Sequence, residues 1–169
     1  MAKGIPLMGR GPDGRAKMIN VDENGNVKVQ LSGTNLAKKY TAADIPANRL
    51  LYIGDESHTW GGTPVKAIDI SRFKKVFVKV HNMGDTSLSN CRIAFGLTGT
   101  LDEASSEEVI NIGQLPAGAV LKVQLVEHLD ALIPEDTIQI VKNCYPYFIF
   151  RAWAQSQQDV SLLYTGGVV

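Results

Sequence analysis

Short apolar runs, spaced about ten residues apart after residue 48, are the feature that most constrains how this chain can fold. Gly, Pro, Asn and Asp residues separate the runs, and no long segment shows the apolar period of an amphipathic helix. Strands at this spacing are typical of an antiparallel β-sandwich or a jelly roll. The pattern therefore predicts an all-β fold, with strands over residues 50–54, 65–70, 75–82, 91–97, 109–112, 120–126, 137–141, 147–154 and 161–164.

Side-chain alternation along residues 75–82 supports the strand prediction and indicates which face is buried. Val76, Val78 and Val80 occupy every second position, so in a strand they share one face and pack against a core. The same alternation recurs along residues 91–97 and 147–154. The one helical segment we expect in this part of the chain is a single turn over residues 127–132.

The first 17 residues are rich in Gly, Pro and Arg. Such a segment buries little apolar surface, so we expect an extended arm unless a partner orders it. The arm is basic, since four Lys and Arg residues against one Asp give it a net charge of +3, and the remainder is −3 (13 − 16). Arg10 and Arg15 are therefore candidate attachment residues.

A β-hairpin is predicted directly after this arm. Residues 18–22 and 27–31 flank Asn24-Gly25, a dipeptide that tolerates the positive φ angles of a type I′ turn. An isolated hairpin is marginally stable in water, so it should pack on another subunit or on the main domain. The apolar residues available for that contact are Val21, Val27, Val29 and Leu31.

These features divide the chain into three predicted parts. Residues 1–33 form the arm and hairpin, and we expect them to serve in attachment. Residues 34–48 are interpreted as a connector with at most one helical turn, near residues 41–44. Residues 49–169 form the β-sandwich, whose length is sufficient for a proper core.

Composition excludes several broad classes of protein. The 17 Lys and Arg residues balance 17 Asp and Glu, so no general attraction to nucleic acid or to an anionic membrane is expected. Hydrophobic content of 44% and charged content of 20% are globular values. The start of the chain has no apolar signal-peptide core, and no apolar stretch is long enough to span a bilayer. We expect synthesis inside a cell without an export signal.

No cofactor or metal is expected from the residues. Cys91 and Cys144 lack zinc-site spacing; two free buried thiols are the favoured interpretation, with a disulfide as the alternative. The sequence Asp22-x-Asn24-x-Asn26 resembles the opening of a calcium loop. Position 6 of that loop would have to be Gly and position 12 Glu, but Val27 and Gly33 stand there.

Four acidic residues are candidates for glycoside hydrolysis. Paired carboxylates can hydrolyse glycosidic bonds when one of them is protonated. A polar loop lacks the apolar pocket that raises a catalytic pKa, so we interpret this cluster as a solvated loop and expect no enzyme activity. The four residues are Asp102, Glu103, Glu107 and Glu108.

Trp60 is a candidate platform for a carbohydrate. It lies beside Gly61-Gly62 and close to His58, and flat aromatic rings stack on pyranose rings in sugar-binding sandwiches. The competing interpretation, which we favour, is a Trp that plugs one end of the sandwich or makes a subunit contact.

Residues 21–33 and residues 68–84 together resemble segments of small virion structural proteins of tailed bacteriophages, especially those of Gram-positive hosts. The first segment is similar to their N-terminal attachment portion. The second is similar to their β-sandwich portion, where Ile-Ser-x-Phe-Lys-Lys leads into a strand that ends in an Asn-x-Gly turn. The Gln114–Gly118 turn fits the same portion. The resemblance carries no catalytic or ligand residue.

The resemblance implies a non-enzymatic protein located in the virion, either as a tail or baseplate appendage or as a head decoration. Its partners would be other virion proteins and copies of itself, with a trimer favoured by analogy of fold alone. The alternative is a carbohydrate-binding receptor module that recognises host cell-wall glycans through Trp60.

Overall fold

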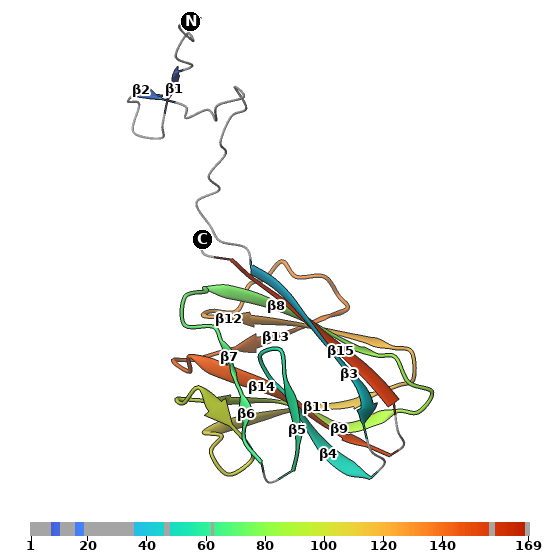
Figure 1. Ribbon diagram of the computed structural model, residues 1–169. Helices are drawn as coiled ribbons and strands as arrows, with labels where there is room; N and C mark the ends of the chain where they lie inside the picture. Colours follow the sequence, from blue (N-terminus) through green and yellow to red (C-terminus); the bar gives the residue numbers. More distant parts are fainter. Residues whose placement is uncertain are drawn as a thin grey trace, which may run out of the picture. The chain divides into compact units, whose positions relative to one another are not determined.

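The computed structural model describes residues 48–61, 63–155 and 158–167, together with the backbone of strands at residues 8–10, 16–18 and 36–45. By its internal contacts the chain separates into two units, residues 1–32 and residues 33–169. Figure 1 labels strands of both units, though not β10 (Thr100–Leu101).

The first unit contains a two-stranded antiparallel ribbon. In it, β1 (Met8–Arg10) pairs with β2 (Ala16–Met18), and Arg10 lies opposite Ala16. Part of the arm predicted over residues 1–17 is thus paired as a ribbon. The remainder of the predicted hairpin lies outside the described residues, as do the candidate contact residues Arg15, Val21, Val27, Val29 and Leu31.

Two large sheets and a short two-stranded ribbon form the strands of the second unit (Figure 1). Sheet I has the strand order β11-β9-β14-β4-β5, and β7 pairs with the beginning of β14. Its strands are β4 (Arg49–Ile53), β5 (His58–Trp60), β7 (Ile68–Asp69), β9 (Leu88–Gly96), β11 (Glu108–Leu115) and β14 (Tyr147–Ala154). Sheet II has the order β13-β12-β8-β15-β3. Its strands are β3 (Leu36–Ile45), β8 (Lys75–Asn82), β12 (Val120–Val126), β13 (Thr137–Val141) and β15 (Gln158–Gly167).

The prediction of an all-β fold with antiparallel sheets is confirmed. Every strand pair within the two sheets is antiparallel except β12 with β13, which run parallel. The bounds of β8, β12, β13 and β14 agree with the predicted strands, because alternation or a continuous apolar run marks each of these segments.

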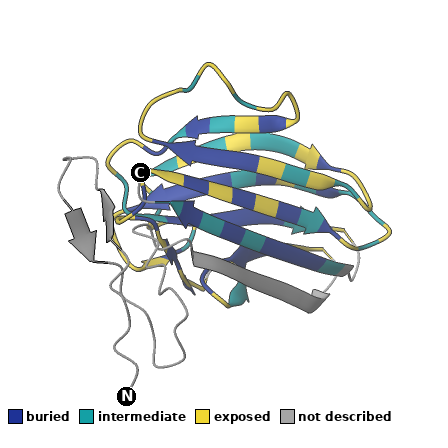
Figure 2. Ribbon diagram, turned by 90° about the horizontal axis from the view of Figure 1, so that it is seen from above, coloured by how far each residue is buried: buried dark blue, intermediate teal, exposed yellow. Residues whose placement is uncertain are grey.

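The main core lies between the inner faces of the two sheets. Along β8, buried and exposed residues alternate, and Val76, Val78 and Val80 are the buried set (Figure 2). They belong to one apolar cluster with Ile93 of β9 and Phe148 of β14. Burial of these side chains from both sheets is the main favourable contribution to folding.

A second, smaller core covers the outer face of sheet I. The short strands β6 (Val65–Lys66) and β10 (Thr100–Leu101) pair as an antiparallel ribbon, here called the β6–β10 ribbon. Val65 and Leu101 of this ribbon pack with Tyr52 and Ile149 of sheet I. β14 is therefore buried on both faces over its first half, which explains its continuous apolar sequence.

Two expectations for connecting segments are wrong. The connector predicted over residues 34–48 is mostly strand, because β3 pairs with β15 along its length. The helical turn predicted over residues 127–132 is absent from this described segment, which forms bends between β12 and β13. The backbone hydrogen bonds that create β3 are made with a strand more than a hundred positions away, so local sequence gives little indication of it.

The two cysteines are free thiols, as favoured from the sequence. Cys91 is buried in the main core, and its burial raises the pKa of the thiol to about 11. Cys144 is exposed, which corrects the expectation that both thiols are buried. It follows a strand rather than occupying an inward position within one.

Substitution of Ile93 tests the main core. Ile93 is 0% exposed between the sheets, so Ile93→Ala should lower the free energy of unfolding by about 2–5 kcal/mol. Ile138 in the edge strand β13 is 40% exposed, and Ile138→Ala should cost about 1 kcal/mol or less. Urea unfolding followed by fluorescence measures both values. Equal losses in the two variants would contradict the assignment of the inner face.

Candidate functional site

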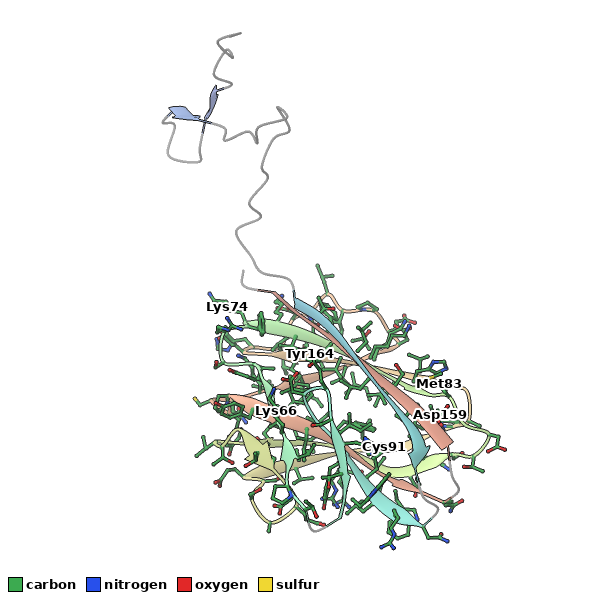
Figure 3. All side chains as sticks on the ribbon, in the orientation of Figure 1. Lys66, Lys74, Met83, Cys91, Asp159 and Tyr164 are labelled. Atoms are coloured by element: carbon green, nitrogen blue, oxygen red, sulfur yellow. The ribbon has the colours of Figure 1, made fainter. Side chains whose placement is uncertain are left out.

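The candidate site is a polar cavity of about 340 Å³ at one end of the sandwich. Its walls come from both sheets, from the β6–β10 ribbon and from the loops between strands. Figure 3 labels two of its residues, Lys66 on β6 and Tyr164 on β15. The complete lining is Asp55, Lys66, Ala67, Asp69, Arg72, Phe73, Gly99, Tyr147 and Tyr164.

A buried carboxylate forms the base of the cavity. The hydroxyl of Tyr164 donates a hydrogen bond to Asp55 Oδ1 at 2.9 Å, and Lys66 Nζ lies 2.8 Å from Asp55 Oδ2. The backbone N–H of Asp55 also donates to the carbonyl of Lys66 at 2.7 Å. A buried carboxylate is tolerated only with such partners, so these contacts hold the end of β4, the ribbon and sheet II together. We call these three residues the Asp55 clasp.

Two glycines allow the walls of the cavity to approach each other. A β-carbon on Gly54 would lie 1.8 Å from the carbonyl oxygen of Lys66, a distance that no side chain can adopt. A β-carbon on Gly166 would lie 2.5 Å from the ring of Phe73. Any larger residue at either position must displace the backbone or the ring beside it.

The outer wall of the cavity carries further polar groups. Asp69 Oδ1 accepts a hydrogen bond from the backbone N–H of Ser71 at 2.9 Å, which fixes the turn after β7. The guanidinium of Arg72 lies 5.9 Å from the centroid of the Phe73 ring. Tyr147 packs over Gly99, where a β-carbon would lie 3.8 Å from its ring.

The charges around the cavity balance. Asp55 and Asp69 face Lys66 and Arg72, two of each sign. Burial, followed by the hydrogen bond to Asp55, raises the pKa of Tyr164 above its ordinary value of 10.0, so its hydroxyl stays a donor at neutral pH. The hydrogen bond to Asp55 also raises the pKa of Lys66, which keeps its charge. The cavity thus offers donors and acceptors together without a net charge, and it suits hydroxyl or peptide groups.

Trp60 does not line this cavity. It lies at the end of β5, on an edge of sheet I, where it is half-buried and partly packed against the main core. His58 meets its ring edge-to-face, with the ring centroids 5.1 Å apart. Part of the Trp60 side chain therefore serves the fold itself.

Three of the four acidic residues between Asp102 and Glu108 are held by different neighbours. Asp102 accepts hydrogen bonds from the N–H and the hydroxyl of Ser105, and these bonds lower the pKa of Asp102. Glu103 pairs with Arg151 at 3.0 Å, and Glu108 accepts from Asn143 at 3.0 Å. These contacts belong to a folded loop, and they give Asp102 the opposite pKa shift from a general acid.

Sequence reasoning did not identify the residues of the cavity. Asp55 and Tyr164 are 109 positions apart, and neither belongs to a motif with known spacing. The signal that existed was Tyr164 itself, a residue with a hydroxyl in an otherwise apolar stretch, because a buried tyrosine usually has a hydrogen-bond partner.

Among the described residues no helix is long and apolar enough to cross a membrane. The same part of the chain holds no group of three His, Cys, Asp or Glu residues arranged to bind a metal ion. Comparison of the chain with protein-family models, with curated proteins and with solved structures finds no match.

The Asp55 clasp predicts how stability depends on alkaline pH. The pKa of Tyr164 is higher in the folded chain, so the unfolded chain loses this proton first. The clasp's contribution is complete below pH ~10 and is lost as the pH rises through the raised folded pKa. Tyr164→Phe should therefore be less stable than wild type at pH ~7, and the difference should shrink above pH ~10. Urea unfolding at pH ~7 and above pH ~10 measures the difference in stability between wild type and variant. A difference that is the same at both would show that Tyr164 makes no such contribution.

Proposed function

We propose that this chain is a non-enzymatic structural protein of a bacteriophage virion, attached through residues 1–33 and displaying the sandwich. The resemblance of residues 21–33 and 68–84 to virion proteins supports the proposal. The chain divides into a unit of 32 residues and a larger sandwich unit with its own core, and this division supports separate roles for the two parts.

The observation that carries the proposal is the position at which the chain enters the sandwich. β3 is the first strand of the sandwich and β15 is the last, and they pair with Leu36 opposite Gly166. The chain therefore enters and leaves at one end of sheet II. The cavity adjoins this end, because Tyr164 lies opposite Lys38, two residues after Leu36. In the proposal this end faces the particle, and the cavity is available to polar groups of a neighbouring virion protein.

Charge and strand order support the same division of roles. Residues 1–32 carry five Lys and Arg against three Asp and Glu, a net charge of +2, so residues 33–169 carry −2 (12 − 14). β3 is also an edge strand of sheet II. An edge strand can pair with a strand of another chain, which is a route to assembly with other virion proteins or into a homo-oligomer, with a trimer still favoured.

Removal of residues 1–33 tests the attachment role. A phage that lacks the gene is complemented with the full chain or with the truncated chain, and purified particles are probed by immunoblot. The truncated chain should fold, as judged by circular dichroism, and should be absent from particles. The full chain carrying Arg10→Glu and Arg15→Glu is the control for folding, and it should be incorporated less than wild type because the arm's charge is reversed.

Incorporation of the truncated chain at the wild-type level would contradict the proposal, since attachment would then depend on the sandwich. If the full chain with both substitutions is incorporated at the wild-type level, Arg10 and Arg15 have no role in attachment.

A further inference from the structure

Two arginines face each other on the outer side of sheet I. In the register of β14 with β9, Arg151 lies directly opposite Arg92. Their neighbours Phe150 and Ile93 pack into the main core, so the arginines take the opposite face. Side chains that are directly opposite on antiparallel strands have β-carbons about 4.5–5.5 Å apart, and like charges there are destabilising.

The pair has one carboxylate for two positive charges. Arg151 is 5% exposed, and its Nη2 lies 3.0 Å from Glu103 Oε1. Within the described residues the side chain of Arg92 makes neither an ion pair nor a hydrogen bond. The Nε atoms of both arginines are buried without a hydrogen-bond partner. A buried guanidinium that lacks full compensation is costly, so the pair favours a further anion.

The two strands that carry the pair add polar groups and no acid. β9 and β14 contain no Asp or Glu in their sequences. On the far side of Arg92, Asn111 of β11 is directly opposite it and is exposed, so its amide can donate a hydrogen bond. Trp153 lies two positions beyond Arg151 on β14 and is half-buried.

We propose that Arg92 and Arg151 form an oxyanion-binding site, which takes a phosphate, sulfate or carboxylate group. Arg92 is partly exposed and contacts the anion, because its planar fork of N–H donors matches two oxygens of such a group. Arg151, which is more deeply buried, supplies the second positive charge. Glu103 competes with the anion for Arg151. The site shares none of the cavity's lining residues and does not depend on the proposed function.

Thermal unfolding of the full chain in phosphate, sulfate or acetate tests the site, with sodium chloride at equal ionic strength as the reference. A bound anion raises the unfolding temperature in a saturable way, from which an affinity is obtained. At least one oxyanion should stabilise the wild type beyond chloride, and which one does so distinguishes tetrahedral anions from carboxylates. Arg92→Gln should weaken binding by about tenfold or more, because the accessible donor fork is lost.

Glu103→Gln should change the oxyanion affinity in the opposite direction from Arg92→Gln. The Glu103 side chain is 58% exposed, so the substitution should be tolerated by the fold. It leaves Arg151 without its carboxylate, so the variant should unfold earlier than wild type in chloride, bind the oxyanion more tightly and recover stability in it. Arg49→Gln removes an exposed arginine of β4 and should leave the affinity unchanged. Equal effects of oxyanions and chloride, wild-type affinity in Arg92→Gln, or no tighter binding in Glu103→Gln would each overturn the proposal.

Discussion

The buried carboxylate of Asp55 is the interaction on which the end of the sandwich depends. A carboxylate removed from water needs charged or hydrogen-bonded partners, and Asp55 obtains them from Tyr164 of sheet II and Lys66 of the β6–β10 ribbon. One side chain thereby connects the end of β4, the ribbon and the last strand. The close approach at Gly54 belongs to the same arrangement, because a side chain there would collide with the backbone of Lys66. The cavity exists because these elements are held at fixed distances.

The two-sheet core was predictable from the sequence because it follows from local pattern. β8 alternates between buried and exposed residues along its length, and this pattern is visible in the sequence without knowledge of its neighbours. β3 carries no such pattern, since its strand conformation comes from pairing with β15. Ile149 alternates with Phe148 and Phe150 and faces away from the main core, but the β6–β10 ribbon buries it in a second core. Covering of one sheet by a distant ribbon leaves no local signal.

The distinction between local sequence pattern and contacts made by distant segments also applies to the candidate sites. Trp60 and the acids at residues 102–108 attracted attention because their residue types are conspicuous in the sequence. In the structure Trp60 packs partly against the main core, and Asp102 is bonded to Ser105. The cavity and the arginine pair consist of ordinary residues that become distinctive only when strand register and loop contacts bring them together.

The cavity, the Asp55 clasp and the point at which the chain enters the sandwich lie together at one end of sheet II, the end that the proposed function turns toward the particle. The hydrogen bond between Tyr164 and Asp55 should therefore stabilise this end of the sandwich. A double-mutant cycle with Asp55→Ala and Tyr164→Phe, measured by urea unfolding at neutral pH, tests it most directly. The coupling free energy between the two substitutions should be about 1–3 kcal/mol. Effects that add to within about 0.5 kcal/mol would contradict it.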